Sequence, residues 1–185
     1  MNIFTESEGG EMENTFGKPI IPINEEQRLL QLHLYTEPDN FPDKYFKAVA
    51  KTIARSFNTP IALISLVGSE HVTFKGNFGM EGVVSTPRGI SLCSLAILDN
   101  NPTIYEDARK EPCLLNNPLV AGDFGLQFYA GVPLTTKEGF NIGTVCVVDK
   151  EPRDFSEQEV ALLTKFAESI IGELENRHIL KSAGK

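Results

Sequence analysis

The sequence contains three cysteines, Cys93, Cys113 and Cys146, which are its strongest candidates for covalent chemistry. A thiolate is a good nucleophile, and a second thiol within reach can close a disulfide with it. The three residues are widely spaced, and neither a CxxC motif nor a cysteine–histidine cluster accompanies them. This spacing argues against a zinc site, so we expect three free thiols in a reducing compartment, which is the cytoplasm.

Polar residues that could bind a ligand lie in two expected loops, residues 77–97 and 107–125, and in the strand that follows them. Loops of this length are usually functional or disordered. We therefore expect a ligand pocket between these loops and a sheet. The expected lining residues are Arg88, Ser91, Cys93, Asp107, Gln127 and Tyr129.

Arg88 and Asp107 can each be interpreted in two ways. The guanidinium of Arg88 would suit an anionic ligand at the mouth of a pocket, but it could equally form a salt bridge that holds the loop. Asp107 ends a short expected strand, and Arg109 follows two residues later. Its carboxylate could face the pocket or serve only turn geometry and solvation. The sequence leaves both alternatives open.

The segment 126–134 alternates between the two faces of the expected sheet. Its even-numbered positions are all apolar, whereas the odd-numbered ones include Gln127 and Tyr129. One face must pack on helices and the other must look into the pocket, and parity alone does not decide which. Because Gln127 and Tyr129 are polar, we assign their face to the pocket.

The histidines and the common catalytic motifs add no further chemistry. His33 and His178 fall on expected helices and His71 begins an expected strand, where a lone histidine is usually solvated. The motifs GxSxG, GxGxxG and HExxH and the P-loop are absent. We therefore expect no catalytic residue, no cofactor and no metal, while an unknown small molecule could still bind.

The composition is that of a soluble globular chain, with 41% hydrophobic and 23% charged residues among 185. A net charge of −8 argues against nucleic acid and anionic membranes as main partners. The longest uncharged apolar run, residues 60–67, is far shorter than the roughly 20 residues of a membrane-spanning helix. The first residues resemble no secretory signal.

Helical periodicity predicts three long helices, over about residues 24–35, 42–57 and 156–180. Ser156 and Glu159 have the spacing of a capping box at the start of the last helix. Residues 1–18 are acidic and lack an apolar period, which predicts a disordered tail. One domain should then occupy residues 19–181.

Strand patterns follow the second helix, at residues 61–67, 71–76, 103–106, 126–135 and 140–149. Tight turns between consecutive strands imply antiparallel pairing. The sequence therefore predicts an α+β fold with a central antiparallel sheet of about five to six strands. The terminal helices should cover one face, and loops with short helices should form a pocket on the other.

Eight short segments, in their order and spacing, are typical of one domain family. They are RLLQL (28–32), TPIALISLV (59–67), GISLCSLAI (89–97), YEDARKEP (105–112), NPLV (117–120), FYAGVPL (128–134), GTVCVVDKEPRDFS (143–156) and LENR (174–177). The chain resembles a GAF domain, and most of all the bacterial type found alone or ahead of histidine kinases and diguanylate cyclases. The resemblance implies a non-enzymatic sensory or regulatory domain in signal transduction that binds a small molecule or a partner signalling protein.

Two alternatives remain within the resemblance. Free methionine-R-sulfoxide reductases look like single GAF domains, and Cys93 matches one of their cysteine positions, with Cys113 as the expected second thiol. Their other cysteine positions fall near Val83 and Asn117 here, and Cys146 should be a small buried apolar residue. The second alternative is a scaffold domain without any ligand.

The terminal helices carry more apolar residues than one sheet face can bury. Leucines occur on more than one side of the first helix, and apolar residues continue along the last helix through Leu174, Ile179 and Leu180. A two-fold axis would bury both surpluses. We therefore expect a homodimer through helices 24–36 and 156–180, which is also how GAF-like domains commonly pair.

Overall fold

The computed structural model describes residues 12–36 and 44–184. The helices are α1 (Glu25–Tyr35), α2 (Lys44–Phe57), α3 (Cys93–Ala96), α4 (Pro118–Ala121) and α5 (Glu157–Ala183). The strands are β1 (Ile61–Val67), β2 (His71–Phe78), β3 (Ser85–Pro87), β4 (Thr103–Tyr105), β5 (Phe128–Thr135) and β6 (Asn141–Asp149). Three short 3₁₀ turns complete the fold, η1 (Arg88–Ile90), η2 (Ala108–Lys110) and η3 (Pro112–Leu114).

The six strands form one antiparallel sheet in the order β3-β2-β1-β6-β5-β4. The central strands β1 and β6 pair from Ile61↔Val148 to Leu66↔Gly143. Both are buried along nearly their whole length, which explains why their sequences are apolar almost throughout rather than alternating. The expected α+β fold with an antiparallel sheet is confirmed.

One strand was not expected. We predicted a loop over residues 77–97, but β3 forms within it and pairs with the start of β2, from His71↔Pro87 to Thr73↔Ser85. Three residues are too few to show a period of two, so the sequence carries no signal for this strand. It lies at the edge of the sheet, where Pro87 can sit without breaking a ladder hydrogen bond.

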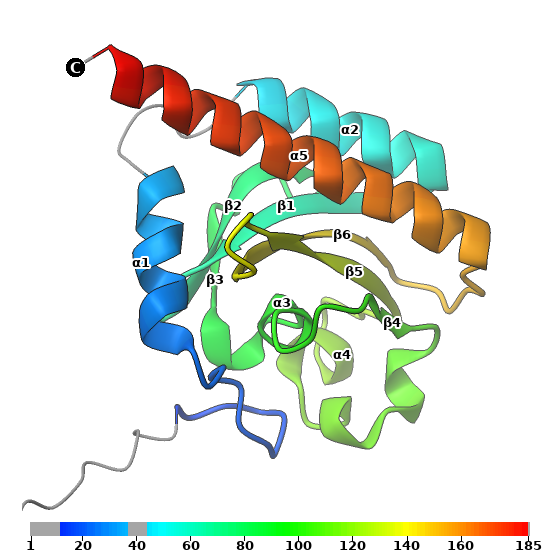
Figure 1. The fold of residues 1–185 in the computed structure, drawn as a ribbon. Coiled ribbons are helices and arrows are strands. Elements are labelled where there is room, and N and C mark those ends of the chain that lie inside the picture. Colours follow the sequence, from blue (N-terminus) through cyan, green and yellow to red (C-terminus); the bar gives the residue numbers. More distant parts are fainter. Residues whose placement is uncertain (1–11, 37–43, 185) are drawn as a thin grey trace, which may run out of the picture.

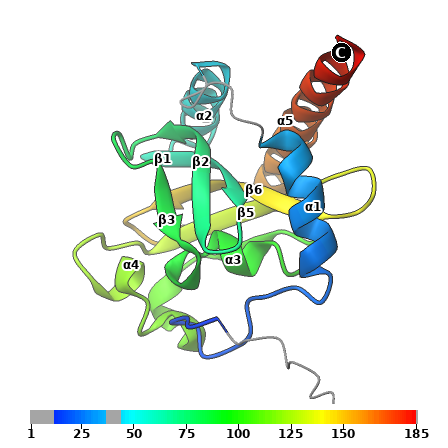
Figure 2. The same ribbon diagram turned by 90° about the vertical axis from the view of Figure 1, so that its left-hand side faces the viewer.

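Helices cover one face of the sheet and loops the other, as expected. Figures 1 and 2 show α2 and α5 against one face, with α3 and α4 on the opposite face, which we call the loop side. Two hydrophobic clusters match these layers. Phe46, Phe128 and Leu163 belong to the helix-side cluster. Cys93 and Tyr129 belong to the loop-side cluster.

The capping box at the start of α5 is confirmed. The Ser156 hydroxyl accepts a hydrogen bond from the Glu159 N–H, and the Glu159 carboxylate accepts one from the Ser156 N–H. The helix continues to Ala183, beyond its expected end at Leu180. Although α5 has 27 residues, no helix in the described part of the chain is long and apolar enough to cross a membrane.

Residues 12–18, the first that the structure describes, correct the expected domain boundary at residue 19. Phe16 is buried in the loop-side cluster. The Thr15 N–H donates to the Gly89 carbonyl at 3.0 Å, and the Asn117 side-chain amide donates to the Thr15 hydroxyl at 3.0 Å. One aromatic side chain and these hydrogen bonds hold residues 12–18 against the domain despite their polar composition. The predicted disorder of residues 1–11 and the predicted start of α2 at Pro42 lie outside the described residues.

Candidate functional site

A small cavity of about 40 Å³ lies on the loop side of the sheet. Strands β1, β5 and β6 form its floor, and half-buried Met80, Leu119 and Phe124 lie at its outer end. One water molecule needs about 10–15 Å³ of such space, so the cavity admits a few water-sized molecules. Its lining consists of Leu63, Phe74, Met80, Thr86, Ser91, Leu92, Cys93, Leu119, Phe124, Leu126, Tyr129, Cys146 and Val148.

Two thiols meet at the floor of this cavity. Cys93 is the first residue of α3 and Cys146 lies on β6, and their buried Sγ atoms are 4.0 Å apart. The Tyr129 hydroxyl donates to the Cys93 Sγ at 3.5 Å, and the Ser65 hydroxyl lies 3.4 Å from the same sulfur. Thr144, which pairs with Ser65 across β1 and β6, places a further buried hydroxyl near Cys93.

These contacts shift the pKa values of the two thiols in opposite directions. The hydrogen bond with Cys146 lowers the pKa of Cys93 against the opposing effect of burial, and Ser65 and Tyr129 lower it further. The same hydrogen bond, together with burial, raises the pKa of Cys146. Burial and the nearby thiols also raise the pKa of Tyr129, which keeps its phenol protonated as a donor. Cys93 is therefore the thiol of the pair that ionises first.

Three of the six expected lining residues meet at the cavity, namely Ser91, Cys93 and Tyr129. Tyr129 faces the loop side, while its neighbours Phe128 and Ala130 belong to the helix-side cluster, in agreement with the alternation along the strand. Leu126 departs from that alternation and also lines the cavity, because β5 begins only at Phe128. Arg88, Asp107 and Gln127 do not line it.

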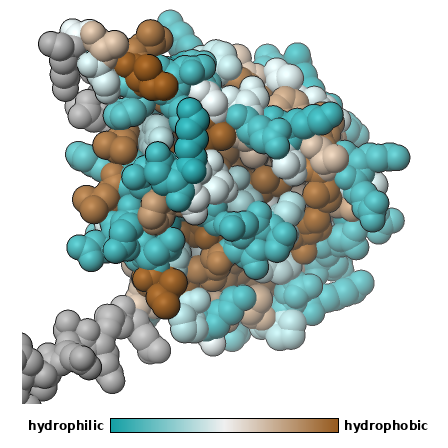
Figure 3. Space-filling model, viewed as in Figure 1, coloured by the Kyte–Doolittle hydropathy of each residue, from teal (hydrophilic) through white to brown (hydrophobic). Residues whose placement is uncertain are grey.

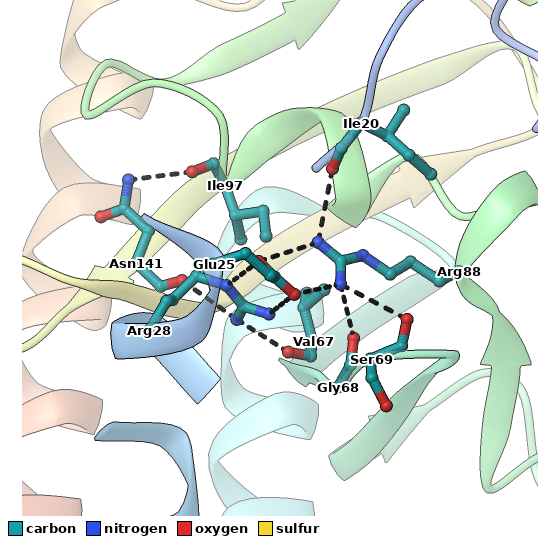
Figure 4. A network of polar contacts seen from close by, with 9 residues as sticks. All are labelled: Ile20, Glu25, Arg28, Val67, Gly68, Ser69, Arg88, Ile97 and Asn141. Carbon is teal, nitrogen blue, oxygen red and sulfur yellow. Dashed lines mark hydrogen bonds and ion pairs between the residues drawn. The ribbon is translucent and has the colours of Figure 1, made fainter. Parts of the chain in front are cut away.

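Arg88 is fully buried in an ionic network away from the cavity, as Figure 4 shows. Its Nη1 donates to the Glu25 carboxylate and to the Gly68 carbonyl at 3.0 Å, and its Nη2 donates to the Ile20 carbonyl at 3.3 Å. Of the two interpretations open for Arg88, the structure shows the salt bridge. This salt bridge joins the loop that contains Arg88 to α1 and to the segment that precedes α1.

Arg28 completes the network from α1. Its Nε and Nη2 donate to the two carboxylate oxygens of Glu25 at 2.8 Å, and its Nη1 donates to the Val67 carbonyl at 2.8 Å. It also reaches the carbonyl of Asn141, whose side-chain amide in turn donates to the Ile97 carbonyl at 3.1 Å. This network joins α1 to the end of β1, the start of β6 and the loop after α3 (Figure 4).

Asp107 and Gln127 have local roles in the fold. Asp107 caps η2 by accepting the N–H of Arg109, and its carboxylate pairs with the Arg109 guanidinium at 2.9 Å. This hydrogen bond lowers the pKa of Asp107 to about 2. The Gln127 backbone donates to the Asp149 carbonyl and accepts from the Ala108 N–H, so it extends the sheet beyond β5.

Cys146 lines the cavity, although we expected it to be only a small buried apolar residue. Cys113, the expected partner of Cys93, is half-buried on η3 and does not line the cavity. Alternation on β6 puts Cys146 and Val148 on one face and Val145 and Val147 on the other, so parity could have placed Cys146 on the pocket side. Which loop residue meets it depends on tertiary packing. Among the described residues, no group of three or more His, Cys, Asp or Glu side chains could hold a metal ion.

The fold and the position of this cavity define a class of small domain, an antiparallel sheet with helices on one face and a loop-covered cavity on the other. The GAF domain family model matches residues 42–174, and the chain therefore belongs to the GAF domain family. A cyclic di-GMP phosphodiesterase from Pseudomonas aeruginosa is 38% identical over 141 residues, which are 76% of this chain and 23% of that protein. The chain thus spans about a quarter of that relative.

Solved structures share the fold at low sequence identity. The GAF domain of a phosphoenolpyruvate-protein phosphotransferase from Coxiella burnetii has a TM-score of 0.63 at 15% identity, covering 84% of this chain and 95% of that one. A free methionine-R-sulfoxide reductase from Neisseria meningitidis has a TM-score of 0.59 at 16% identity, covering 86% and 91%. These similarities establish the fold, and the family membership supports a sensory or regulatory role.

The comparisons correct one expectation. We expected no enzymatic activity, because no complete catalytic motif was found in the sequence. The Pseudomonas relative is named as an enzyme, and a reductase has the same fold. The absence of familiar catalytic motifs is therefore no evidence against enzymatic activity in this family. Two thiols that only folding brings together leave no motif in the sequence.

Proposed function

We propose that this chain is a sensory domain that regulates cyclic di-GMP signalling by binding a small molecule in the loop-side cavity. The 38% identity with a cyclic di-GMP phosphodiesterase supports the signalling context. The cavity, with Thr86, Ser91, Cys93 and Tyr129 among its polar groups, supports the ligand site. A few polar groups in a mostly apolar pocket are typical of small-molecule sites.

The position of the cavity relative to α5 is the observation that carries this proposal. Strands β5 and β6 line the cavity with Tyr129, Cys146 and Val148, and α5 packs against the same two strands from the opposite face. Small-molecule pockets have volumes of about 300–1,000 Å³, so a metabolite would have to part the loops around Met80 and Leu119. A shift of the strands that accompanies this opening would pass directly to α5, and from there to a partner protein or a further domain.

Native mass spectrometry of freshly purified protein tests the ligand site. We expect a co-purified small molecule, and we expect Leu119→Trp to abolish its binding because the indole would fill the outer end of the cavity. Leu115→Trp is the matched control, since Leu115 is exposed on the same loop and does not line the cavity. Hydrogen exchange along α5 should differ between the bound and empty forms. Retention of the ligand by Leu119→Trp would contradict the proposed site.

A second candidate function is reduction of free methionine-R-sulfoxide, and the Cys93–Cys146 pair favours it. The Cys93 thiol would take up the sulfoxide oxygen, so that the S–O bond of the substrate breaks, methionine leaves and Cys93 becomes a sulfenic acid. Cys146 would then attack the Cys93 sulfur, which forms a disulfide and releases water. The family cysteine position near Asn117 is not available for this chemistry, because Asn117 is buried and hydrogen-bonded to Thr15 and the Ile90 carbonyl. Turnover of free methionine-R-sulfoxide with a thioredoxin system, lost in Cys93→Ser, would support this activity, and its absence would leave the sensory function alone.

A further inference from the structure

We propose that Cys93 and Cys146 form an intramolecular disulfide when the domain meets a small hydroperoxide, which makes the floor of the loop-side cavity a redox modification site. The disulfide would link α3 on the loop side to β6 in the centre of the sheet. This inference stands on the geometry of the two thiols and does not rest on the proposed ligand or signalling role.

The separation of the sulfurs permits the bond. The Sγ atoms lie 4.0 Å apart, and a disulfide requires about 2.05 Å, so they must approach each other by about 2 Å. Cys146 is held in the middle of a central strand, whereas Cys93 sits on a helix of only four residues that is flanked by loops. Movement of Cys93 toward the sheet is therefore the easier route to bonding distance.

The cavity determines which oxidants reach the pair. Both cysteines line it, and its volume of about 40 Å³ has room for a molecule the size of hydrogen peroxide. A bulky disulfide reagent would be excluded unless the loops around Met80 and Leu119 parted. The buried Thr144 hydroxyl and the Tyr129 phenol, which both contact Cys93, offer hydrogen-bonding groups beside the sulfurs.

The reaction has two balanced steps. In the first, the Cys93 sulfur attacks one peroxide oxygen, an S–O bond forms as the O–O bond breaks, and water leaves; Cys93 is now a sulfenic acid, oxidised by two electrons. In the second, the Cys146 sulfur attacks the Cys93 sulfur, the S–S bond forms as the S–O bond breaks, and the departing hydroxide takes the Cys146 proton to leave as a second water. Two thiols and one hydrogen peroxide thus give one disulfide and two waters.

Cys93 is the residue that reacts first in this scheme. Its sulfur accepts the hydrogen bond from the Tyr129 phenol and lies beside the Ser65 hydroxyl, and both contacts favour the thiolate over the thiol. Cys146 is completely buried beside it and is placed to resolve the sulfenic acid before further oxidation. Cys113 is half-buried on η3 and serves as an internal comparison.

Peptide mapping after peroxide treatment tests the proposal, because trypsin places each cysteine on its own peptide, residues 89–109, 111–137 and 138–150. The folded protein is treated with hydrogen peroxide, remaining thiols are alkylated, and the digest is analysed by mass spectrometry. We expect a linked pair of the first and third peptides, and an intact mass reduced by two hydrogens. Cys113→Ser is the matched control and should form the same link.

Two variants define the order of the steps. In Cys146→Ser we expect a sulfenic acid on Cys93 that a dimedone probe traps, and in Tyr129→Phe we expect the link to form several-fold more slowly. The proposal is overturned if folded protein, checked by circular dichroism, keeps both thiols under conditions that oxidise Cys113. It is also overturned if Cys113, rather than Cys146, appears in the link to Cys93. Neither result bears on small-molecule binding, which the native mass spectrometry decides separately.

Discussion

The buried Arg28–Glu25–Arg88 network is the residue-scale feature on which the loop side depends most. Both guanidiniums are almost completely buried, and the half-buried Glu25 carboxylate is the shared acid between them. Buried charges are tolerated only when they are paired and hydrogen-bonded. The network therefore holds α1 and η1 against the end of β1. It thereby also fixes the start of the loop that follows Arg88 and covers the cavity.

Replacing Glu25 with Gln should destabilise the protein by about 3 kcal/mol, because it leaves two buried guanidiniums without their counter-charge. The free energy of unfolding from urea titration is the measurement. Glu26→Gln is the matched control, since Glu26 is exposed in the same helical turn and should change stability by less than about 0.5 kcal/mol. Equal effects of the two substitutions would show that the network is not stabilising.

The same carboxylate should contribute to acid sensitivity. Burial raises the pKa of Glu25, but the hydrogen bonds and charges of Arg28 and Arg88 outweigh burial, so the folded pKa lies below the ordinary value of 4.5. Its stabilising contribution is complete above pH 4.5 and is lost as the pH falls through the lowered folded value. The unfolding free energy of wild type should thus fall more steeply below pH 4.5 than that of Glu25→Gln. Parallel pH profiles would contradict this assignment.

At the scale of elements, the segment 12–18 depends on close backbone contact with η1. A Cβ on Gly89 would lie 2.4 Å from the carbonyl oxygen of Glu13, so Gly89→Ala must displace this segment. We expect faster hydrogen exchange at the Thr15 amide, which donates to the Gly89 carbonyl. Gly172→Ala is the matched control, because a Cβ there meets nothing within 4 Å and should stabilise α5 by about 0.5–1 kcal/mol. Unchanged Thr15 protection in Gly89→Ala would contradict the packing.

The start of α5 offers a second test at this scale. Ser156→Ala removes the side-chain acceptor for the Glu159 N–H and should lower the unfolding free energy by about 1 kcal/mol. Ser169→Ala, on an exposed position within the same helix, should leave stability unchanged or slightly increased because alanine has the higher helix propensity. Denaturant titration of both variants checks the difference, and a Ser156→Ala protein as stable as wild type would show that the box contributes little.

The sequence predicts the elements of this fold much better than the contacts between distant ones. A nearly continuous apolar run between Pro60 and Gly68 placed β1 at residues 61–67, and the Ser156–Glu159 spacing placed the start of α5. Long-range pairings leave no such pattern. The partner of Arg88 is Glu25, 63 residues away, and the partner of Cys93 is Cys146, 53 residues away. The candidate site could be located on the loops from sequence, but these pairings follow only from packing.

At the scale of the whole molecule, apolar surface remains where the ends of α1 and α5 meet. The rings of Tyr35 and His178 are 5.6 Å apart, which places the last turn of α1 beside the end of α5. Leu174 is buried within the domain, whereas five further large apolar side chains on these two helices are exposed. Figure 3 shows brown patches over α1 and over the end of α5. The exposed side chains are Leu30, Leu34, Ile179 and Leu180 toward this end and Leu162 near the start of α5. Fewer apolar side chains are therefore exposed than the sequence led us to expect, but both helices carry some of them.

A homodimer through α1 and α5 would bury this surface, at about 25 cal/mol for each Å² of apolar area removed from water. We expect sedimentation equilibrium at micromolar concentration to report twice the monomer mass of 20.4 kDa. The double variant Leu34→Glu/Leu180→Glu should be monomeric, because two-fold symmetry places each introduced charge in the interface twice. Leu115→Glu, at an exposed position on the loop side, is the control and should remain dimeric. A wild-type species of 20.4 kDa that persists as the concentration rises would exclude the dimer, and α5 would then have to act on a different partner.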